Sequence, residues 1–175
     1  MLFADEAGVR SDHHTGTTWG PVGQTPVVRR SAARVSVQMI SAIGLDGSMQ
    51  FMVHEGSGTA EVFLRFLQQL MLNAEQPIVL VVDVHSIHKA KLIKVYVAAT
   101  LGELELVYLP PYSPQLNPDK QVWKNVKAEA VKKPAGNEFD FRPVVEKALL
   151  SLQGMTHVIA SFFRHPKCGF VSLLT

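Results

Sequence analysis

The sequence predicts an α/β protein in which one mixed sheet starts with a β-meander and carries helices on both faces. Alternating apolar positions over residues 35–56 indicate antiparallel strands, and further strands then alternate with helical patterns. Parallel strands need such crossover helices. With 175 residues, of which 47% are hydrophobic and 18% charged, we expect one domain with a sizeable core.

The strands are expected in four places. The first should be short: it covers residues 1–4, and Asp5 follows it. The runs VSVQMISAI and MQFMVHEG form a hairpin, because Asp46-Gly47 between them has the residue types of a tight turn. The continuous apolar run PIVLVVD is typical of a strand buried on both faces, and it ends at Asp83. LELVYLP predicts one more short strand.

The helices follow from apolar spacing. Positions 62, 63, 66, 67, 70 and 71 form the stripe of an amphipathic helix, which Thr59 can cap. Further helical patterns cover residues 87–99, 118–132, 141–153 and 156–163. Pro118 suits the first turn of its helix.

Composition excludes several classes of protein. The net charge of +2 does not by itself identify a binder of polyanions. The lone Cys168 can form neither an internal disulfide nor a multi-thiolate zinc site, so we expect it to be buried. No apolar run approaches the roughly 20 residues that cross a bilayer, and the N-terminus lacks the regions of a signal peptide. We therefore expect a soluble, cytoplasmic protein with no membrane partner.

Three acidic residues stand where an open α/β sheet usually builds its site. Asp5 and Asp83 follow predicted strands, and Asp119 lies in the helix after LELVYLPPYSP. The ends of neighbouring strands converge in space. Carboxylates that converge without cysteines suit a hard cation, Mg²⁺ or Mn²⁺. From spacing alone, Asp5-Glu6 could equally open a turn.

Four motifs in this order resemble the catalytic core of the mariner-superfamily insertion-sequence transposases: FADEAGVRSD, WGPVGQTP, VVDVHSIHKAK and LPPYSPQLNPDKQVWKNVK. The resemblance covers about residues 2–165. It implies an RNase H-like fold over residues 1–175 and a DDE or DDD acidic triad. It also implies metal-dependent DNA strand cleavage and strand transfer with two Mg²⁺ or Mn²⁺ ions, for which Asp5 and Asp83 are the first two acids and the metal ligands.

The resemblance has further implications for partners. It implies DNA as the partner, both transposon ends and target, with nucleoid association when DNA is bound, and it suggests a homodimer. Relatives carry an N-terminal helix-turn-helix region, which we expect to be absent because the sequence starts almost at Asp5. The residues that contact DNA are not predicted.

The sequence departs from the family at the third acid. That position holds Lys120, and Asp119 falls on the variable position before it. Successive helical residues point about 100° apart, so Asp119 cannot simply replace its neighbour. An ammonium about 4 Å from a dication opposes it by up to about 8 kcal/mol at an effective dielectric near 20. The second metal site is therefore expected to be impaired, and Lys120 could instead act as a built-in cation between the carboxylates.

Two alternatives to an active or impaired transposase stay open: a non-catalytic DNA-binding or structural remnant of the fold, and an RNase H-like nuclease that cuts without joining. Smaller choices also stay open. His85 and His88 could bind zinc, or His88 could orient Asp83. Tyr112 and Trp123 could stack on bases, or they could pack the proline-rich loop against the helix.

Overall fold

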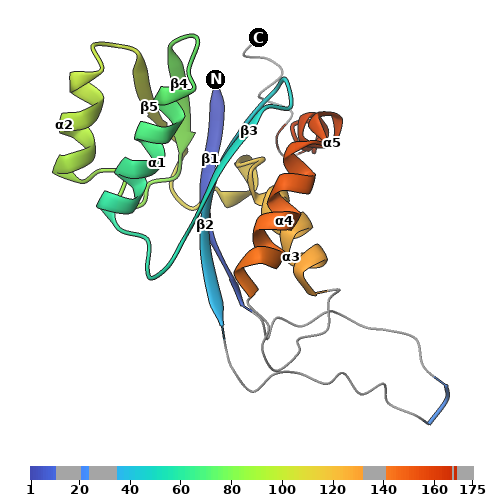
Figure 1. The fold of residues 1–175 in the computed structure, drawn as a ribbon. Helices are drawn as coiled ribbons and strands as arrows, with labels where there is room; N and C mark the ends of the chain where they lie inside the picture. Colours follow the sequence, from blue (N-terminus) through green and yellow to red (C-terminus); the bar gives the residue numbers. More distant parts are fainter. Residues whose placement is uncertain (11–20, 24–34, 132–140, 167, 169–175) are drawn as a thin grey trace.

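The computed structural model describes residues 1–10, 21–23, 35–131, 141–166 and 168, in which helices cover both faces of one sheet (Figure 1). The strands are β1 (Leu2–Arg10), β2 (Ser36–Gly44), β3 (Met49–His54), β4 (Ile78–Val82) and β5 (Leu104–Tyr108). The helices are α1 (Ala60–Leu72), α2 (Lys91–Ala99), the 3₁₀ turn η1 (Pro114–Leu116), α3 (Lys120–Val131), α4 (Phe141–Gln153) and α5 (Thr156–Phe162). The predicted mixed sheet with an initial meander is confirmed.

The strand order β3-β2-β1-β4-β5 places β1 at the centre of the sheet. β1, β2 and β3 form the antiparallel meander, while β4 and β5 run parallel to β1. Phe3 of β1 lies opposite Val81 of β4. Two residues further along each chain come Asp5 and Asp83, so this register brings the two predicted acids to neighbouring strands.

The first strand is longer than the sequence suggested. We expected it to cover only residues 1–4, but it continues to Arg10, and Asp5 lies inside it. The physical reason is β2, which pairs with β1 along all nine residues from Leu2↔Gly44 to Arg10↔Ser36 and so satisfies the backbone. Residues such as Asp5 and Gly8 have low strand propensity, so the sequence pattern did not predict this part of the strand.

Two apolar cores lie on opposite faces of the sheet. One contains Phe3 and Val9 of β1 with side chains from α3, α4 and α5. The other contains Ala4 with side chains from α1 and α2. Figure 1 shows the same division, with α1 and α2 on one side of the strands and α3, α4 and α5 on the other. Since side chains alternate along a strand, Asp5 shares the Phe3 face and points toward α3.

The predicted helices are found, with differences at their starts. The helices at 141–153 and 156–163 match within a residue. α2 begins four residues later than expected, because residues 86–90 form turns in which Lys89 N donates to Ser86 O. α3 begins at Lys120 rather than at 118. Cys168 is buried, as predicted. Among the described residues, no helix is long and apolar enough to cross a membrane.

The hairpin turn between β2 and β3 yields a prediction about stability. Gly47 has a φ of +84°, and a Cβ there would collide with the carbonyl group of Thr156 at the start of α5. Gly56 also has positive φ, +74°, but has open space around it. Gly56→Ala should cost about 1–2 kcal/mol of left-handed strain. Gly47→Ala should cost roughly 1–3 kcal/mol more, because α5 must shift.

Urea unfolding of both variants measures this difference. Equal losses of unfolding free energy in Gly47→Ala and Gly56→Ala would show that the turn does not pack against α5.

Candidate active site

Asp5 and Asp83 lie close together, as the sequence predicted. Asp5 is buried at 7% exposure in the middle of β1, and Asp83 directly follows β4. Burial raises the pKa of Asp5, Lys120 and Trp123 act to lower it, and the nearby negative charge of Asp83 raises it further; the net pKa is raised. The two carboxyl groups are thus near enough to interact electrostatically.

One oxygen of Asp5 accepts two hydrogen bonds from α3. Lys120 Nζ lies 2.7 Å from Asp5 Oδ2. Trp123 Nε1 donates to the same oxygen at 2.8 Å. Residues three apart share one face of a helix, so both donors reach Asp5 together. Trp123 is buried, whereas the Lys120 side chain is 40% exposed. Of the two roles considered for Trp123, the structure shows packing.

Asp119 points elsewhere, although it precedes Lys120 directly. It is fully buried, and the Ser41 hydroxyl of β2 donates to its two oxygens at 2.6 and 2.8 Å. Ser41 lies opposite Asp5 in the β1–β2 pair, so Asp119 packs over the sheet beside Asp5. This placement gives no support to a catalytic role for Asp119, which has no route to solvent.

The start of α3 is tied to the sheet by Asn117. Its Oδ1 accepts the backbone N–H of Asp119 at 3.1 Å, while its Nδ2 donates to the carbonyl of Ala4 at 2.9 Å. The first contact is the local turn that Asn commonly makes ahead of a helix. The second fixes the helix start one residue from Asp5. Together with Ser41, Asn117 therefore sets which residues of α3 reach the acidic site.

Asp83 is oriented by two histidines. The backbone N–H of His85 donates to Asp83 Oδ1 at 3.1 Å, and His88 Nδ1 lies 3.0 Å from the Asp83 backbone carbonyl and 3.1 Å from Oδ1. The other ring nitrogen of His88 lies 3.2 Å from Glu6 Oε1. His88 is buried at 3% exposure, which lowers its pKa, but Glu6 and Asp83 outweigh burial and the net pKa is raised. The geometry matches the prediction that His88 orients Asp83.

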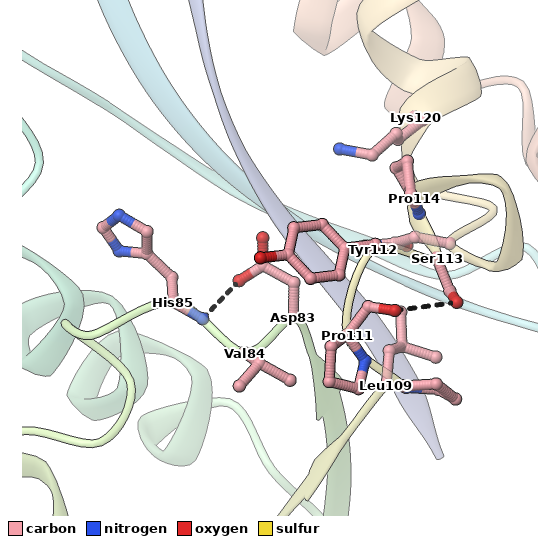
Figure 2. Close-up of a pocket in the computed structure, with 11 residues that line it drawn as sticks. Asp83, Val84, His85, Leu109, Pro111, Tyr112, Ser113, Pro114 and Lys120 are labelled. Atoms are coloured by element: carbon pink, nitrogen blue, oxygen red, sulfur yellow. Dashed lines mark hydrogen bonds between the residues drawn. The ribbon is translucent and has the colours of Figure 1, made fainter.

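A cavity of about 360 Å³ opens beside these residues (Figure 2). Asp83 and His85 line one side, and Lys120 and the proline-rich loop that carries Tyr112 line the other. The Asp83 side chain is 53% exposed, so its carboxylate faces this space. The cavity therefore joins the second predicted acid to the residue at the third acidic position.

The donor set fits one hard cation better than two. Asp5 and Asp83 supply the oxygen ligands that Mg²⁺ or Mn²⁺ prefers. The third position supplies an ammonium, which cannot coordinate a metal. Among the described residues, no three His, Cys, Asp or Glu side chains form a group that could hold a metal ion.

Sequence reasoning missed three residues of this site: Ser41, Glu6 and Asn117. Ser41 and Glu6 contact residues that lie 78 and 82 positions away in the sequence, Asp119 and His88, and the sequence carries no local signal for either contact. Asn117 had one, because Asn-Pro before a helix is typical of a residue whose side chain closes the first turn.

Asp119 gives a prediction about pH. Burial raises its pKa well above the ordinary value, and the charge of Asp5 adds to the rise. The Asp119 carboxyl group therefore holds its proton more tightly in the folded state than in the unfolded state. Because of this, the free energy of unfolding falls as pH rises from about 4 toward the raised pKa of Asp119. Asp119→Asn keeps the shape of the side chain without its charge. The free energy of unfolding of this variant should therefore lack the decrease with pH, and the variant should be more stable than the parent at neutral pH.

Urea unfolding at several pH values between 4 and 8 tests this. Asp46→Asn is the control, and its effect should change with pH in the opposite direction. Hydrogen bonds from Ser48 lower the pKa of Asp46, so removing this carboxylate should destabilise the protein more as pH rises. A constant difference between Asp119→Asn and the parent across this range would refute the assignment.

The model of the DDE superfamily endonuclease family matches residues 1–140. No curated protein matches the sequence. The Mos1 strand transfer complex aligns with a TM-score of 0.61 and 16% identity, covering 96% of this chain and 53% of that chain. The mariner Mos1 paired end complex with Mg aligns with a TM-score of 0.62 and 15% identity, over 93% and 53%.

The catalytic core domain of BIV integrase aligns with a TM-score of 0.53 and 16% identity, covering 86% of this chain and 80% of that chain. The chain spans about half the length of the Mos1 chains, at 53%. At these identities the structural likeness shows the fold, and the family match covers most of the sequence. The chain therefore belongs to the DDE superfamily of endonucleases, with the RNase H-like fold of a mariner-type transposase catalytic core.

Proposed function

We propose that this chain is a transposase catalytic domain whose metal-dependent DNA strand cleavage and transfer are impaired by Lys120. The observation that carries the proposal is the 2.7 Å ion pair between Lys120 Nζ and Asp5 Oδ2. By resemblance, that position in the family holds an acid. Here it holds a cation that already neutralises the first acid of the site.

Asp5 and Asp83 are the residues that would hold Mg²⁺ or Mn²⁺. When bound, such ions activate a water or hydroxyl nucleophile and stabilise the leaving oxygen of a phosphodiester. His88 fixes the Asp83 carboxylate at 3.1 Å, and Trp123 fixes Asp5 at 2.8 Å. These contacts reduce the side-chain motion that ligand binding would otherwise have to restrict. The Mos1 paired end complex with Mg is a related fold that contains such an ion.

Lys120 weakens metal binding in two ways. It removes a carboxylate ligand, and it places a positive charge on the oxygen that an ion would need. A dication about 4 Å from the ammonium is opposed by up to about 8 kcal/mol. Because the Lys120 side chain is 40% exposed, it can swing toward solvent and reduce this figure. The second ion therefore loses its site, while the first is weakened.

The same ion pair favours a second candidate, a non-catalytic DNA-binding remnant. Asp5 is buried, and without a metal ion its carboxylate needs another positive partner. Lys120 supplies that partner without any ion. A fold stabilised in this way would keep its surface while losing turnover. An RNase H-like nuclease differs from both candidates, because it would cut DNA without joining strands.

DNA is the proposed partner. Two of the similar structures are Mos1 strand transfer and paired end complexes. DNA binding by this chain should weaken steeply with salt, because contacts to phosphates release counterions. A homodimer stays a prediction of the resemblance, which light scattering with and without DNA would test.

Lys120→Glu is the variant that tests the proposed impairment. It should bind Mn²⁺ about tenfold more tightly than the parent or better, since a carboxylate replaces an ammonium beside Asp5. Isothermal titration with Mn²⁺ measures binding. Metal-dependent nicking and strand transfer of labelled DNA measure activity, which should rise in the variant alone.

Lys147→Glu is the matched control, because Lys147 is exposed on α4 and the change in charge is the same. Parent activity equal to that of Lys120→Glu would contradict the impairment. Salt-sensitive DNA binding in the parent with no turnover in Lys120→Glu would favour the non-catalytic candidate. Cutting without joining would favour the nuclease.

A further inference from the structure

Tyr112 stands out on the loop between β5 and η1. Its side chain is 100% exposed, so it does not pack the proline-rich loop against α3, which was one of the two roles considered for it. Its φ is +56°, a left-handed conformation that non-glycine residues rarely adopt. Strained conformations of this kind concentrate at functional sites, where the surrounding structure maintains them.

The loop holds this conformation with several fixed points. Pro110, Pro111 and Pro114 surround Tyr112 and restrict the backbone. Leu109 N donates to the carbonyl of Val82 at 2.8 Å, which ties the loop to the end of β4 beside Asp83. After the tyrosine, the Ser113 hydroxyl donates to Pro111 O at 3.3 Å. These contacts restrict the backbone that carries Tyr112, while the ring itself is exposed to solvent.

The ring borders the cavity of the acidic site. Tyr112, Asp83, His85 and Lys120 all line this space of about 360 Å³. Figure 2 shows the ring extending from the proline-rich loop toward the side of the cavity that Asp83 occupies. One wall therefore offers an aromatic face, and another offers the cation of Lys120.

We propose that Tyr112 is a stacking platform for one unpaired DNA base next to the acidic site. This inference rests on the proposed function, because it takes DNA as the ligand. Every base has a π-face that stacks on an aromatic ring regardless of sequence. The Lys120 ammonium can attract the adjoining phosphate. A lone exposed tyrosine needs no explanation, but one with a left-handed backbone on the rim of a cavity that Lys120 and Asp83 also line favours a ligand-binding role.

The size of the cavity is compatible with an unpaired base. Its volume of about 360 Å³ falls at the lower end of the range for small-ligand sites, which suits one nucleotide. A base in a duplex would have to leave its stack to reach the ring, whereas a single-stranded overhang offers its base directly.

The test uses the full chain with duplex DNA that carries a 3′ single-stranded overhang and a fluorescent 2-aminopurine in that overhang. A blunt duplex of the same sequence is the comparison. Tyr112→Phe keeps the ring and should bind the overhang like the parent, with the same quenching of 2-aminopurine. Tyr112→Ala should lose the quenching and bind the overhang about 5- to 150-fold more weakly, or about 1–3 kcal/mol at 1.4 kcal/mol per tenfold.

Leu101→Ala is the matched control. Leu101 is 92% exposed and also has a positive φ, +52°, but it does not line this cavity. It should leave binding to both DNA molecules unchanged, and Tyr112→Ala should leave binding to the blunt duplex unchanged.

The outcomes separate this inference from the proposed function. If the parent binds DNA in a salt-sensitive way and Tyr112→Ala binds the overhang equally well, the stacking role alone is overturned. A loss in Tyr112→Phe as large as in Tyr112→Ala would also overturn it, because the ring would not be the feature that binds. If the parent binds neither DNA at low salt, both the stacking role and the DNA partner fail.

Discussion

The contact between Lys120 and Asp5 is the interaction on which the rest of this site depends. It joins the first residue of α3 to the middle of the central strand at 2.7 Å, and Trp123 completes it with a second hydrogen bond to the same oxygen. A carboxylate buried on an apolar face is unfavourable unless a charge or hydrogen-bond donors compensate it. In a metal-dependent enzyme the ions provide much of that compensation. In this chain Lys120 and Trp123 provide part of that compensation, and under the proposed function the same Lys120 contact opposes the chemistry.

The neighbouring acid cannot take over because the start of α3 is fixed in register. Asn117 bonds to Ala4 of β1, and Asp119 bonds to Ser41 of β2. A shift of one residue along the helix would move Asp119 toward Asp5, but it would break both of these contacts and displace Trp123 from the core. If the third acidic position is that of Lys120, as the resemblance implies, the direction of the side chains matters as well as the residue type. Asp119 is adjacent in sequence but fully buried against Ser41, whereas Lys120 lines the cavity.

Much of the fold could be predicted from the sequence, because its signals are local. The Asp46-Gly47 turn, the apolar stripe of α1 and the buried run of β4 each depend on residues within one element. The error in β1 has the opposite origin, since Asp5, Glu6 and Gly8 form a strand only because β2 pairs with them. The proximity of Asp5 and Asp83 followed from the parallel arrangement of their strands. The partners Ser41 and Glu6 could not be predicted, because no pattern in a single sequence specifies which strand side chain meets Asp119 or His88, 78 and 82 residues away. The sequence left packing and base stacking open for both Trp123 and Tyr112; Trp123 is buried, whereas Tyr112, directly after Pro110 and Pro111, is exposed without a local sequence signal for it.

The chemistry of this site depends on what occupies the space beside Asp5. A crystal structure of the parent chain grown with saturating Mn²⁺ would show this most directly. Our account predicts at most one ion, held by Asp83 and Asp5, with Lys120 Nζ still bonded to Asp5 and no ion at the third acidic position. Two ions between these strands, with Lys120 turned out to solvent, would contradict the account.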